Sequence, residues 1–271
     1  MDEGAVRIEE LAERFGISLM TAHRDLDELA LRGLLRKTRG VASAAPTSLI
    51  EASDVYRTSR QADEKGAIAL AALEHVEPGQ AIFLDDSTTV LRMVDGLGTK
   101  APLTVLTNSL TLMNEVRTVP ELTLLGLGGQ HHGWCNAFMG PTTAREIGRL
   151  RADALILSMA AISDGVVYHQ SQETIQVKRA MFDAASRRIL LADHTKFERR
   201  ALHAFGRLAD FDLVIVDDAT PAHHLERMRD EGIEVVVAPV GDLNPDASDA
   251  PGPSGADAAG ASSPRAGAAD A

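Results

Sequence analysis

The sequence is poor in cysteine and in aromatic residues: Cys135 is the single cysteine of 271 residues, and aromatic residues make up 4% of the chain. One cysteine excludes an intrachain disulfide, which fits a reducing compartment. No apolar run reaches the length of a membrane-spanning helix. The acidic residues 1–4 lack the basic and apolar regions of a signal peptide. We therefore expect a soluble, cytoplasmic protein.

Several catalytic and cofactor motifs are also absent. The chain has no Gly-rich Walker loop, no nucleophile elbow and no dinucleotide-binding glycine fingerprint. His131, His132 and Cys135 share one stretch, but their spacing does not match a structural zinc site. We therefore expect neither a metal nor a cofactor. The net charge of -12 excludes a broadly basic nucleic-acid-binding surface, but it allows a small module with a local basic face.

Residues 1–45 have the pattern of such a module. Apolar residues at helical spacing predict a helix from Ile8 to Phe15, which Gly16 ends. Ser18 is suited to cap a second helix that closes at Gly33, and the basic residues 36–41 are a hairpin candidate. Two short helices joined by a glycine-containing turn are typical of a helix-turn-helix. The alternative is a solvated amphipathic hairpin.

Polar and basic side chains of the second helix and the hairpin are the candidates for DNA contacts, because such side chains reach phosphates and guanine edges. Positive charge collects between His23 and Arg39, while acidic residues occupy the preceding helix. The candidate DNA-binding residues are Ser18, Met20, Thr21, His23, Arg24, Arg36, Lys37 and Arg39.

The rest of the chain divides into three stretches. Residues 46–65 are polar and poorly periodic, which predicts a linker. Residues 66–240 alternate apolar strands with amphipathic helices, which is typical of an α/β domain built on a parallel sheet. Residues 241–271 are nearly all Ala, Gly, Ser, Pro and Asp, so they lack the apolar surface that offsets chain entropy. We expect them to form a disordered tail.

The loop that follows the predicted strand 81–84 carries Asp85, Asp86, Ser87, Thr88 and Thr89, and a helix is predicted to begin there. A helix start offers unpaired N–H groups and partial positive charge to an anion. The carboxyl ends of parallel strands are also the usual ligand site of α/β sheets. We therefore expect this loop to bind the phosphate of a small metabolite. The alternative is a plain Ser/Thr helix cap.

Other strands end in polar residues at the same edge of the predicted sheet. Asn108 and Ser109 follow the predicted strand 103–107, and Asp193 and Lys196 follow the predicted strand 188–192. Lys196 is the best single candidate to pair with a phosphate or carboxylate, although most lysines lie on the surface. Glu173, on a predicted helix with Lys178, suits a sugar hydroxyl or simply favours the helix N-terminus.

These motifs resemble the DeoR family of bacterial transcription regulators. The stretch from Ile17 to Leu29, followed by Gly33-Leu34-Leu35-Arg36, is similar to the winged helix-turn-helix of that family. The larger part is similar to its effector domain, which shares a fold with ribose-phosphate isomerases and sugar-phosphate deaminases. The matching pieces are Glu64-Lys65, residues 85–89, Thr107-Asn108-Ser109, Gly128-Gly129, Asp164-Gly165, Lys178, Asp193 and Lys196-Phe197.

The resemblance implies a homo-oligomeric repressor, a dimer or tetramer, whose operator binding responds to a phosphorylated sugar. It implies that residues 87–89 hold the phosphate and that other polar residues line the remaining pocket. The candidate ligand-binding residues are Asp85, Ser87, Thr88, Thr89, Asn108, Ser109, Asp164, Glu173, Lys178, Asp193 and Lys196.

The chain departs from the family pattern in four places. The helix that usually precedes Ile8 is nearly absent, so either the start is placed too late or DNA binding is weakened; Leu11, Phe15 and Leu26 would then be exposed. His23 replaces an arginine, residues 39–41 replace a His-Gly-Gly wing tip, and Ser87 replaces a glycine, which narrows the phosphate loop.

Two other functions remain open from the sequence. An isomerase or deaminase would use Asp85, Asp164 or Asp193 as an acid or base. A leader with a helix-turn-helix pattern argues against this alternative, because such an enzyme does not need one. The third option is a ligand-binding subunit that acts through a partner protein.

Overall fold

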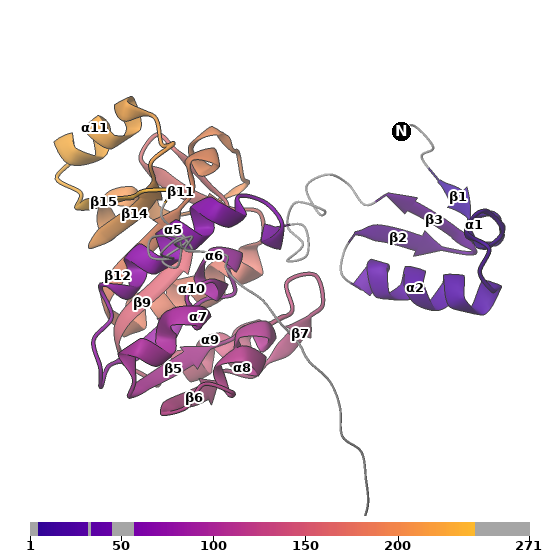
Figure 1. Cartoon of the computed structure of the whole chain (residues 1–271), viewed down its shortest axis with the longest axis horizontal. Helices are drawn as coiled ribbons and strands as arrows, with labels where there is room; N and C mark the ends of the chain where they lie inside the picture. Colours follow the sequence, from indigo (N-terminus) through magenta and orange to yellow (C-terminus); the bar gives the residue numbers. More distant parts are fainter. Residues whose placement is uncertain (1–4, 32–33, 45–56, 242–271) are drawn as a thin grey trace, which may run out of the picture.

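The computed structural model describes residues 5–31, 34–44 and 57–241, with the side chains of Leu31 and Ala44 left out. The described residues form a small N-terminal head, residues 5–44, and a larger α/β domain that starts at residue 57 (Figure 1). No helix in the described part of the chain is long and apolar enough to cross a membrane.

The head is a winged helix-turn-helix, as predicted. Gly16 ends the first helix in the left-handed conformation, at φ 64°, and the Oγ of Ser18 accepts a hydrogen bond of 3.1 Å from the amide of Thr21. The three strands are ordered β1-β3-β2. The elements of the head are β1 (Val6–Arg7), α1 (Ile8–Phe15), α2 (Leu19–Leu31), β2 (Leu35–Thr38) and β3 (Val41–Ala44).

The hairpin of the head closes through a two-residue turn. Thr38 pairs with Val41, which leaves Arg39 and Gly40 between the strands with φ of 48° and 80°. Two consecutive positive φ values are the geometry of a type I′ turn, whose twist matches the flanking strands. The turn therefore puts the exposed side chain of Arg39 at the tip of the hairpin.

The α/β domain is built on a seven-stranded sheet in which all neighbouring strands run parallel. The strand order is β15-β14-β12-β9-β4-β5-β6. These strands were predicted because buried parallel strands are continuous apolar runs. They are β4 (Ala81–Leu84), β5 (Leu103–Thr107), β6 (Leu122–Gly126), β9 (Ala152–Ser158), β12 (Ala185–Ala192), β14 (Leu213–Asp217) and β15 (Val235–Ala238).

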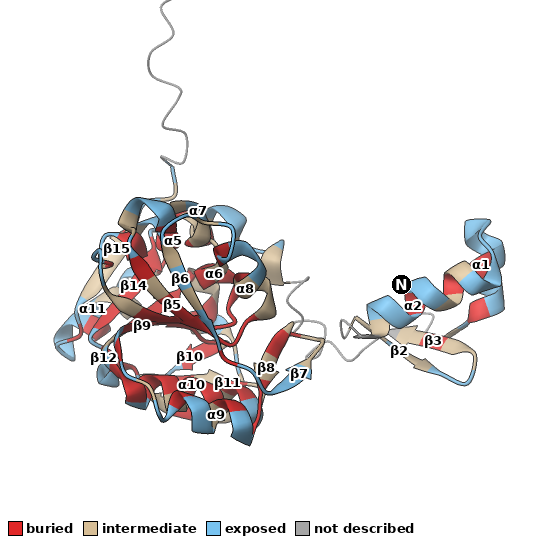
Figure 2. Cartoon of the chain, turned by 90° about the horizontal axis from the view of Figure 1, so that it is seen from below, coloured by how far each residue is buried: buried red, intermediate tan, exposed pale blue. Residues whose placement is uncertain are grey.

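Helices cover both faces of this sheet, and a separate apolar core fills each interface. Figure 2 shows the buried strands between the two helical layers. One layer contains α5 (Ala62–Leu73), α6 (Thr88–Leu91), α7 (Val94–Leu97) and α8 (Leu110–Val116). The other contains α9 (Pro141–Ile147), α10 (Gln172–Ala184) and α11 (Ala222–Asp230). Three short 3-10 helices are η1 (Gly98–Lys100), η2 (His194–Glu198) and η3 (Leu208–Asp210).

Three features differ from the sequence prediction. Helix α5 begins at Ala62, inside the segment expected to be linker. The helix expected over residues 88–96 is two four-residue helices, because the amides of Arg92 and Met93 bond three residues back and tighten the chain. Five short antiparallel strands were not predicted: β7 (Gln130–His132), β8 (Ala137–Met139), β10 (Ala161–Ser163), β11 (Val166–His169) and β13 (His203–Arg207). The predicted tail lies outside the described residues from 242 onward.

Candidate anion-binding site and helix-turn-helix surface

The order of the strands reverses between β4 and β9. From β4 the chain continues to β5 and β6 on one side, and β9, β12, β14 and β15 extend the sheet on the other. Such a reversal leaves a crevice at the carboxyl ends of the two central strands, where α/β sheets bind ligands. The loop of Ser87, Thr88 and Thr89 follows β4, so the structure puts the predicted phosphate loop at this crevice.

A small cavity of about 30 Å³ lies at this crevice. Its volume is that of about one water molecule. The described residues that line it are Arg57, Ser87, Thr88, Thr89, Ser158, Met159, Ala160, Gln170, Lys196 and Arg199. Four of the predicted ligand residues, Ser87, Thr88, Thr89 and Lys196, thus share one cavity.

Asp85 and Lys178 lie beneath the loop and hold it in place. The carboxylate of Asp85 accepts hydrogen bonds from the amides of Ser87 (3.0 Å) and Ser158 (3.1 Å), which joins the ends of β4 and β9. Lys178 forms an ion pair with Asp85, lies 3.3 Å from Asp86 and donates to the carbonyl of Ser158. Neither Asp85 nor Lys178 lines the cavity, so their contacts organise the loop.

The positive charge of the site comes from side chains more than from the helix that follows the loop. Ser87 caps α6 by accepting from the amide of Val90 at 3.3 Å, as the plain-cap alternative predicted. Helix α6 has four residues, so few peptide dipoles align behind its first amides. The lining instead contributes the cationic side chains of Arg57, Lys196 and Arg199.

Two lysines of this site, Lys196 and Lys65, have lowered pKa values. Burial lowers the pKa of Lys196 to about 8; Asp193 opposes the shift, and Arg199 and Arg57 add to it. Burial, with Lys196 next, lowers the pKa of Lys65 to about 7. Asp193 lies 3.7 Å from Lys196 and is 1% exposed. Five cations of this region, Arg57, Lys65, Lys178, Lys196 and Arg199, thus share three buried carboxylates, Asp85, Asp86 and Asp193, which leaves excess positive charge for an anion to neutralise.

Sequence reasoning missed two cationic residues of this lining, Arg57 and Arg199. The Nε and Nη2 atoms of Arg57 are buried and have no hydrogen-bond partner among the described residues. Lys65 donates to the carbonyl oxygens of Arg57 and, at 2.6 Å, of Arg60. Arg57 falls in the predicted linker, where a single arginine in a polar stretch carries no signal of burial.

Four other candidate ligand residues lie outside the lining of this cavity. Asn108 donates to the carbonyl of Phe138 at 2.9 Å, and Ser109 caps α8 through the amide of Leu112. The side chain of Asp164 is 91% exposed at a second cavity of about 170 Å³. Glu173 is 57% exposed and lies 3.6 Å from His132. No metal-binding group of three His, Cys, Asp or Glu occurs among the described residues.

His169 is a neutral neighbour of this site. Burial, and then Lys178, lowers its pKa to about 3. Its Nδ1 accepts a hydrogen bond of 3.1 Å from the amide of Ser171. The proton of the neutral ring therefore resides on Nε2.

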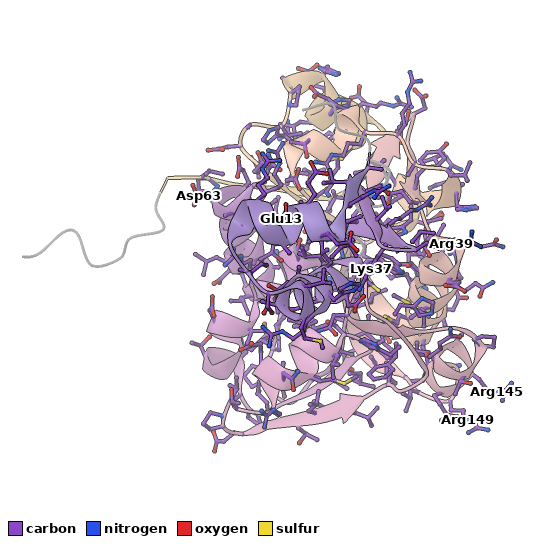
Figure 3. All side chains as sticks on the ribbon, turned by 90° about the vertical axis from the view of Figure 1, so that its right-hand side faces the viewer. Glu13, Lys37, Arg39, Asp63, Arg145 and Arg149 are labelled. Atoms are coloured by element: carbon purple, nitrogen blue, oxygen red, sulfur yellow. The ribbon has the colours of Figure 1, made fainter. Side chains whose placement is uncertain are left out.

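The candidate DNA-binding residues are exposed to different degrees on the head. Met20, Arg24, Arg36 and Arg39 are exposed, and Arg39 extends outward from the hairpin (Figure 3). Thr21 and His23 are half-buried. The hydroxyl of Ser18 is engaged in the helix cap. Lys37 is also engaged: its Nζ lies 2.5 Å from the carboxylate of Asp27 and donates to the carbonyl of His23.

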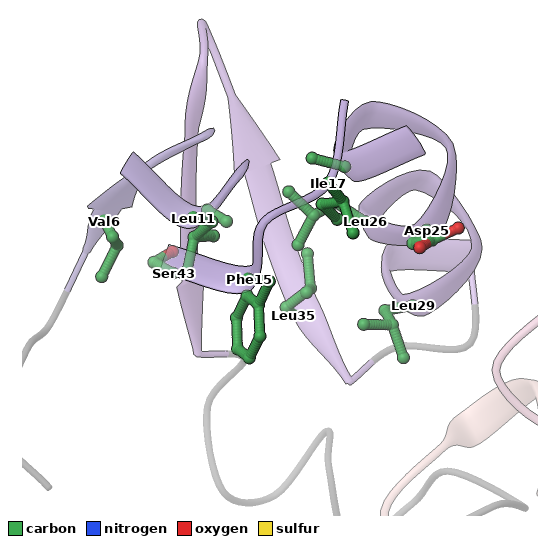
Figure 4. A pocket seen from close by; sticks show the side chains of 11 residues that line it. Val6, Leu11, Phe15, Ile17, Asp25, Leu26, Leu29, Leu35 and Ser43 are labelled. Carbon is green, nitrogen blue, oxygen red and sulfur yellow. The ribbon is translucent and has the colours of Figure 1, made fainter. Parts of the chain in front are cut away.

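An apolar groove of about 640 Å³ opens on the head (Figure 4). Phe15 is 67% exposed at its edge and Leu11 is half-buried, as expected if a covering helix is absent. Leu26 is buried with Ile8 and Ala22, so the expected exposure of Leu26 was wrong. Ile8, Ala12, Ala22, Leu26 and Ala42 form the small buried core of the head.

A winged helix-turn-helix head followed by an α/β domain with a cation-lined crevice defines a DNA-binding protein with a sensor domain. Residues 1–47 match the DeoR-like helix-turn-helix domain, and residues 60–218 match the DeoR C terminal sensor domain. The chain therefore belongs to the DeoR family, as its motifs predicted.

Curated relatives match over most of their length. The transcriptional repressor AccR of Agrobacterium fabrum is 32% identical over 81% of this chain and 86% of its own. The HTH-type transcriptional repressor CsqR of Escherichia coli is 30% identical over 87% and 90%. The glycerol-3-phosphate regulon repressor of Escherichia coli is 30% identical over 86% and 92%.

Among solved structures, the chain is similar in part to ribose 5-phosphate isomerase A from Neisseria gonorrhoeae. It is 14% identical, covers 50% of this chain and 53% of its own, and has a TM-score of 0.37.

Proposed function

We propose that this protein is a transcriptional repressor of a carbohydrate operon and that a phosphorylated sugar, bound at the crevice between β4 and β9, controls its binding to operator DNA. The observation that carries the proposal is the set of one buried and two half-buried cations, Lys196, Arg57 and Arg199, around a hydroxyl-rich loop at the switch point of the sheet. Buried cations without enough carboxylates cost free energy unless an anion neutralises them.

The relatives support the DNA-binding half of the proposal. Three of them carry the name of repressor, and one is a repressor of a glycerol-3-phosphate regulon. In this chain, α2 and the hairpin present Arg24, Arg36 and Arg39 to solvent, as expected of a recognition helix and wing. We expect a homo-oligomer, a dimer or tetramer, because a two-fold dimer reads two half-sites about one DNA turn apart. We also expect the protein to act on the chromosome in the cytoplasm.

The side chains at the crevice favour binding over turnover. None of the described residues that line the cavity carries a carboxylate, which an isomerase needs as a base near the substrate carbon. Asp85 is engaged by Lys178 and two amides, and Asp193 by Lys196 and Thr195. Asp164 faces a different cavity. A carboxylate that could act as the base for sugar chemistry is therefore missing from this lining.

The experiment is a binding titration of the full chain on DNA from its own promoter region, with and without phosphorylated sugars. We expect one phosphorylated sugar to raise the melting temperature and to lower the affinity for that DNA, whereas the same sugar without phosphate does neither. Specific DNA binding that no phosphorylated sugar changes would contradict the sensing half. Conversion of the sugar phosphate by the protein would favour an isomerase or deaminase.

A further inference from the structure

The segment of residues 57–60 is the first described part of the α/β domain, and it directly follows the residues that connect this domain to the head. The side chain of Arg57 reaches the lining of the cavity. Its Nε and Nη2 are buried and lack a hydrogen-bond partner among the described residues, although a guanidinium has five donors. Burying such donors without partners is unfavourable, and the same residue lines a cavity with two other cations, so the two observations together point to a missing acceptor.

The chemistry of that acceptor follows from its neighbours. Lys196 and Arg199 line the same cavity, and the hydroxyls of Ser87, Thr88 and Thr89 complete it. A guanidinium presents its donors in a planar fork that matches two oxygens of a phosphate. The group that fits all of these side chains is a phosphate monoester, whose oxygens accept from cations and hydroxyls together.

The backbone of the segment is fixed to the domain by a buried lysine. Lys65, which is 3% exposed, donates to the carbonyls of Arg57 and Arg60. Gln61, the next residue, adopts a left-handed conformation at φ 47° just before α5. Non-glycine residues with positive φ persist where surrounding contacts hold them. The position of Arg57 is therefore defined by contacts within the domain.

The cavity is too small for its ligand in this structure. A volume of about 30 Å³ holds one water, so a phosphate enters only if part of the lining moves. Ser87, Thr88, Thr89 and Lys196 are nearly fully buried, whereas Arg57 and Arg199 are half-buried. Of these, Arg57 belongs to the segment that leads to the head.

We propose that Arg57 is a direct ligand of the effector phosphate and that, through its place at the entry to the sensor domain, it couples occupancy of the site to the DNA-binding head. This inference rests on the proposed function. It adds a residue that both binds the effector and transmits its presence, because phosphate entry changes the contacts of the segment connected to the head. The two roles are separable by experiment.

The test compares the full wild-type chain with Arg57→Gln, Arg57→Lys and the matched control Arg60→Gln, which changes an exposed arginine three residues away that is not part of the lining. The probes are inorganic phosphate, glycerol 3-phosphate and ribose 5-phosphate, with glycerol and ribose as unphosphorylated controls. Binding is measured by calorimetry. DNA affinity is measured by fluorescence anisotropy at saturating probe, and folding is checked by circular dichroism.

We expect Arg57→Gln to weaken binding of the best probe about 10- to 100-fold, the range of a charge-assisted hydrogen bond. The affinity of Arg57→Lys for the probe should lie between those of Arg57→Gln and wild type, because lysine keeps the positive charge but lacks the planar pair of guanidinium donors. Arg60→Gln should bind within about twofold of wild type. At saturating probe, Arg57→Gln should keep its DNA affinity while wild type and Arg60→Gln lose theirs.

The outcomes separate the inference from the function on which it rests. If wild type binds no probe, the proposed function fails. If wild type responds and folded Arg57→Gln binds within twofold of it, Arg57 is not a ligand and the inference is overturned. If Arg57→Gln binds weakly but still releases DNA in full at saturation, its coupling role is overturned.

Discussion

Replacing Lys178 by methionine should strongly lower the free energy of unfolding of the sensor domain, because Lys178 neutralises two buried carboxylates. The side chains of Asp85 and Asp86 are 0% and 3% exposed, and both lie within ion-pair distance of Lys178. Burial raises the pKa of Asp86, but Lys178 outweighs burial and holds that pKa below its usual value. Removing one partner of a buried pair costs about 3–5 kcal/mol. Total stabilities are typically about 5–15 kcal/mol.

The assay is urea unfolding at pH 7, followed through the fluorescence of Trp134, the single tryptophan, which packs against the core of the α/β domain. Lys100→Met, at partly exposed η1, is the matched control and should change the free energy of unfolding by less than about 0.5 kcal/mol.

The pH dependence gives a second check on the same variant. In wild type, the pKa of Lys178 is raised and that of Asp86 is lowered, so the pair contributes its full stability between pH 3.8 and pH 10.5. The contribution of Asp86 is lost as the pH falls below that range, and the contribution of Lys178 is lost as the pH rises above it. Without Lys178, burial favours protonated carboxyls. The loss of unfolding free energy in Lys178→Met relative to wild type should therefore become smaller as the pH is lowered from 8 to 5. A loss under about 1 kcal/mol at pH 7, or a deficit that grows toward pH 5, would refute this role.

Three further predictions concern the site and the head. Affinity for a phosphorylated sugar should fall above pH 8, by at most about tenfold per pH unit, because Lys196 has a pKa of about 8 and then loses its charge; calorimetry should find weaker, nearly pH-independent binding for Lys196→Gln. The pKa of His169 is lowered from 6.5 to about 3, so the stability that depends on its neutral ring is present above pH 6.5 and lost as pH falls toward 3. The His169→Asn variant keeps an acceptor for the amide of Ser171 and does not titrate. In urea unfolding, its free energy of unfolding relative to that of wild type should therefore rise by about 3 kcal/mol between pH 6.5 and pH 4. The same pH dependence of unfolding free energy in both proteins would contradict this. Arg39→Ala should weaken DNA binding and reduce the slope of log K against log salt concentration by about 1, the value for one lost phosphate contact. The control is Arg14→Ala on α1. An unchanged slope for Arg39→Ala, or an equal effect of the control, would show that the tip of the hairpin does not contact DNA.

Most of the fold could be predicted from the sequence because its elements have strong local signals. Inner strands of the parallel sheet, such as β4 and β14, are buried on both faces, so each contains an apolar run that no turn residue interrupts. The head could be predicted because Gly16 and Ser18 determine where one helix ends and the next begins. The short antiparallel strands carry no comparable pattern, since three to five residues show little periodicity.

The site could be predicted only in part, for a similar reason. The carboxyl ends of parallel strands meet at one edge, which brought Ser87, Thr88 and Lys196 together. Asp164 was expected at the same edge, but Ser163 pairs with Val166 and leaves Asp164 in a two-residue turn at the end of an antiparallel hairpin. Arg57 comes from a segment without periodicity. Residues that reach a site from irregular segments have no sequence pattern to predict them.

The ion pair between Lys178 and Asp85 joins residues 93 positions apart in the chain. During synthesis the phosphate loop leaves the ribosome long before its lysine does. Contacts of such sequence separation form late in folding, because the intervening chain must first be ordered. A partly made chain therefore contains the complete sequence of the head before the two halves of the candidate anion site can meet. The candidate anion site is complete only after Lys196 and Arg199, which follow α10 in the chain, have also been made.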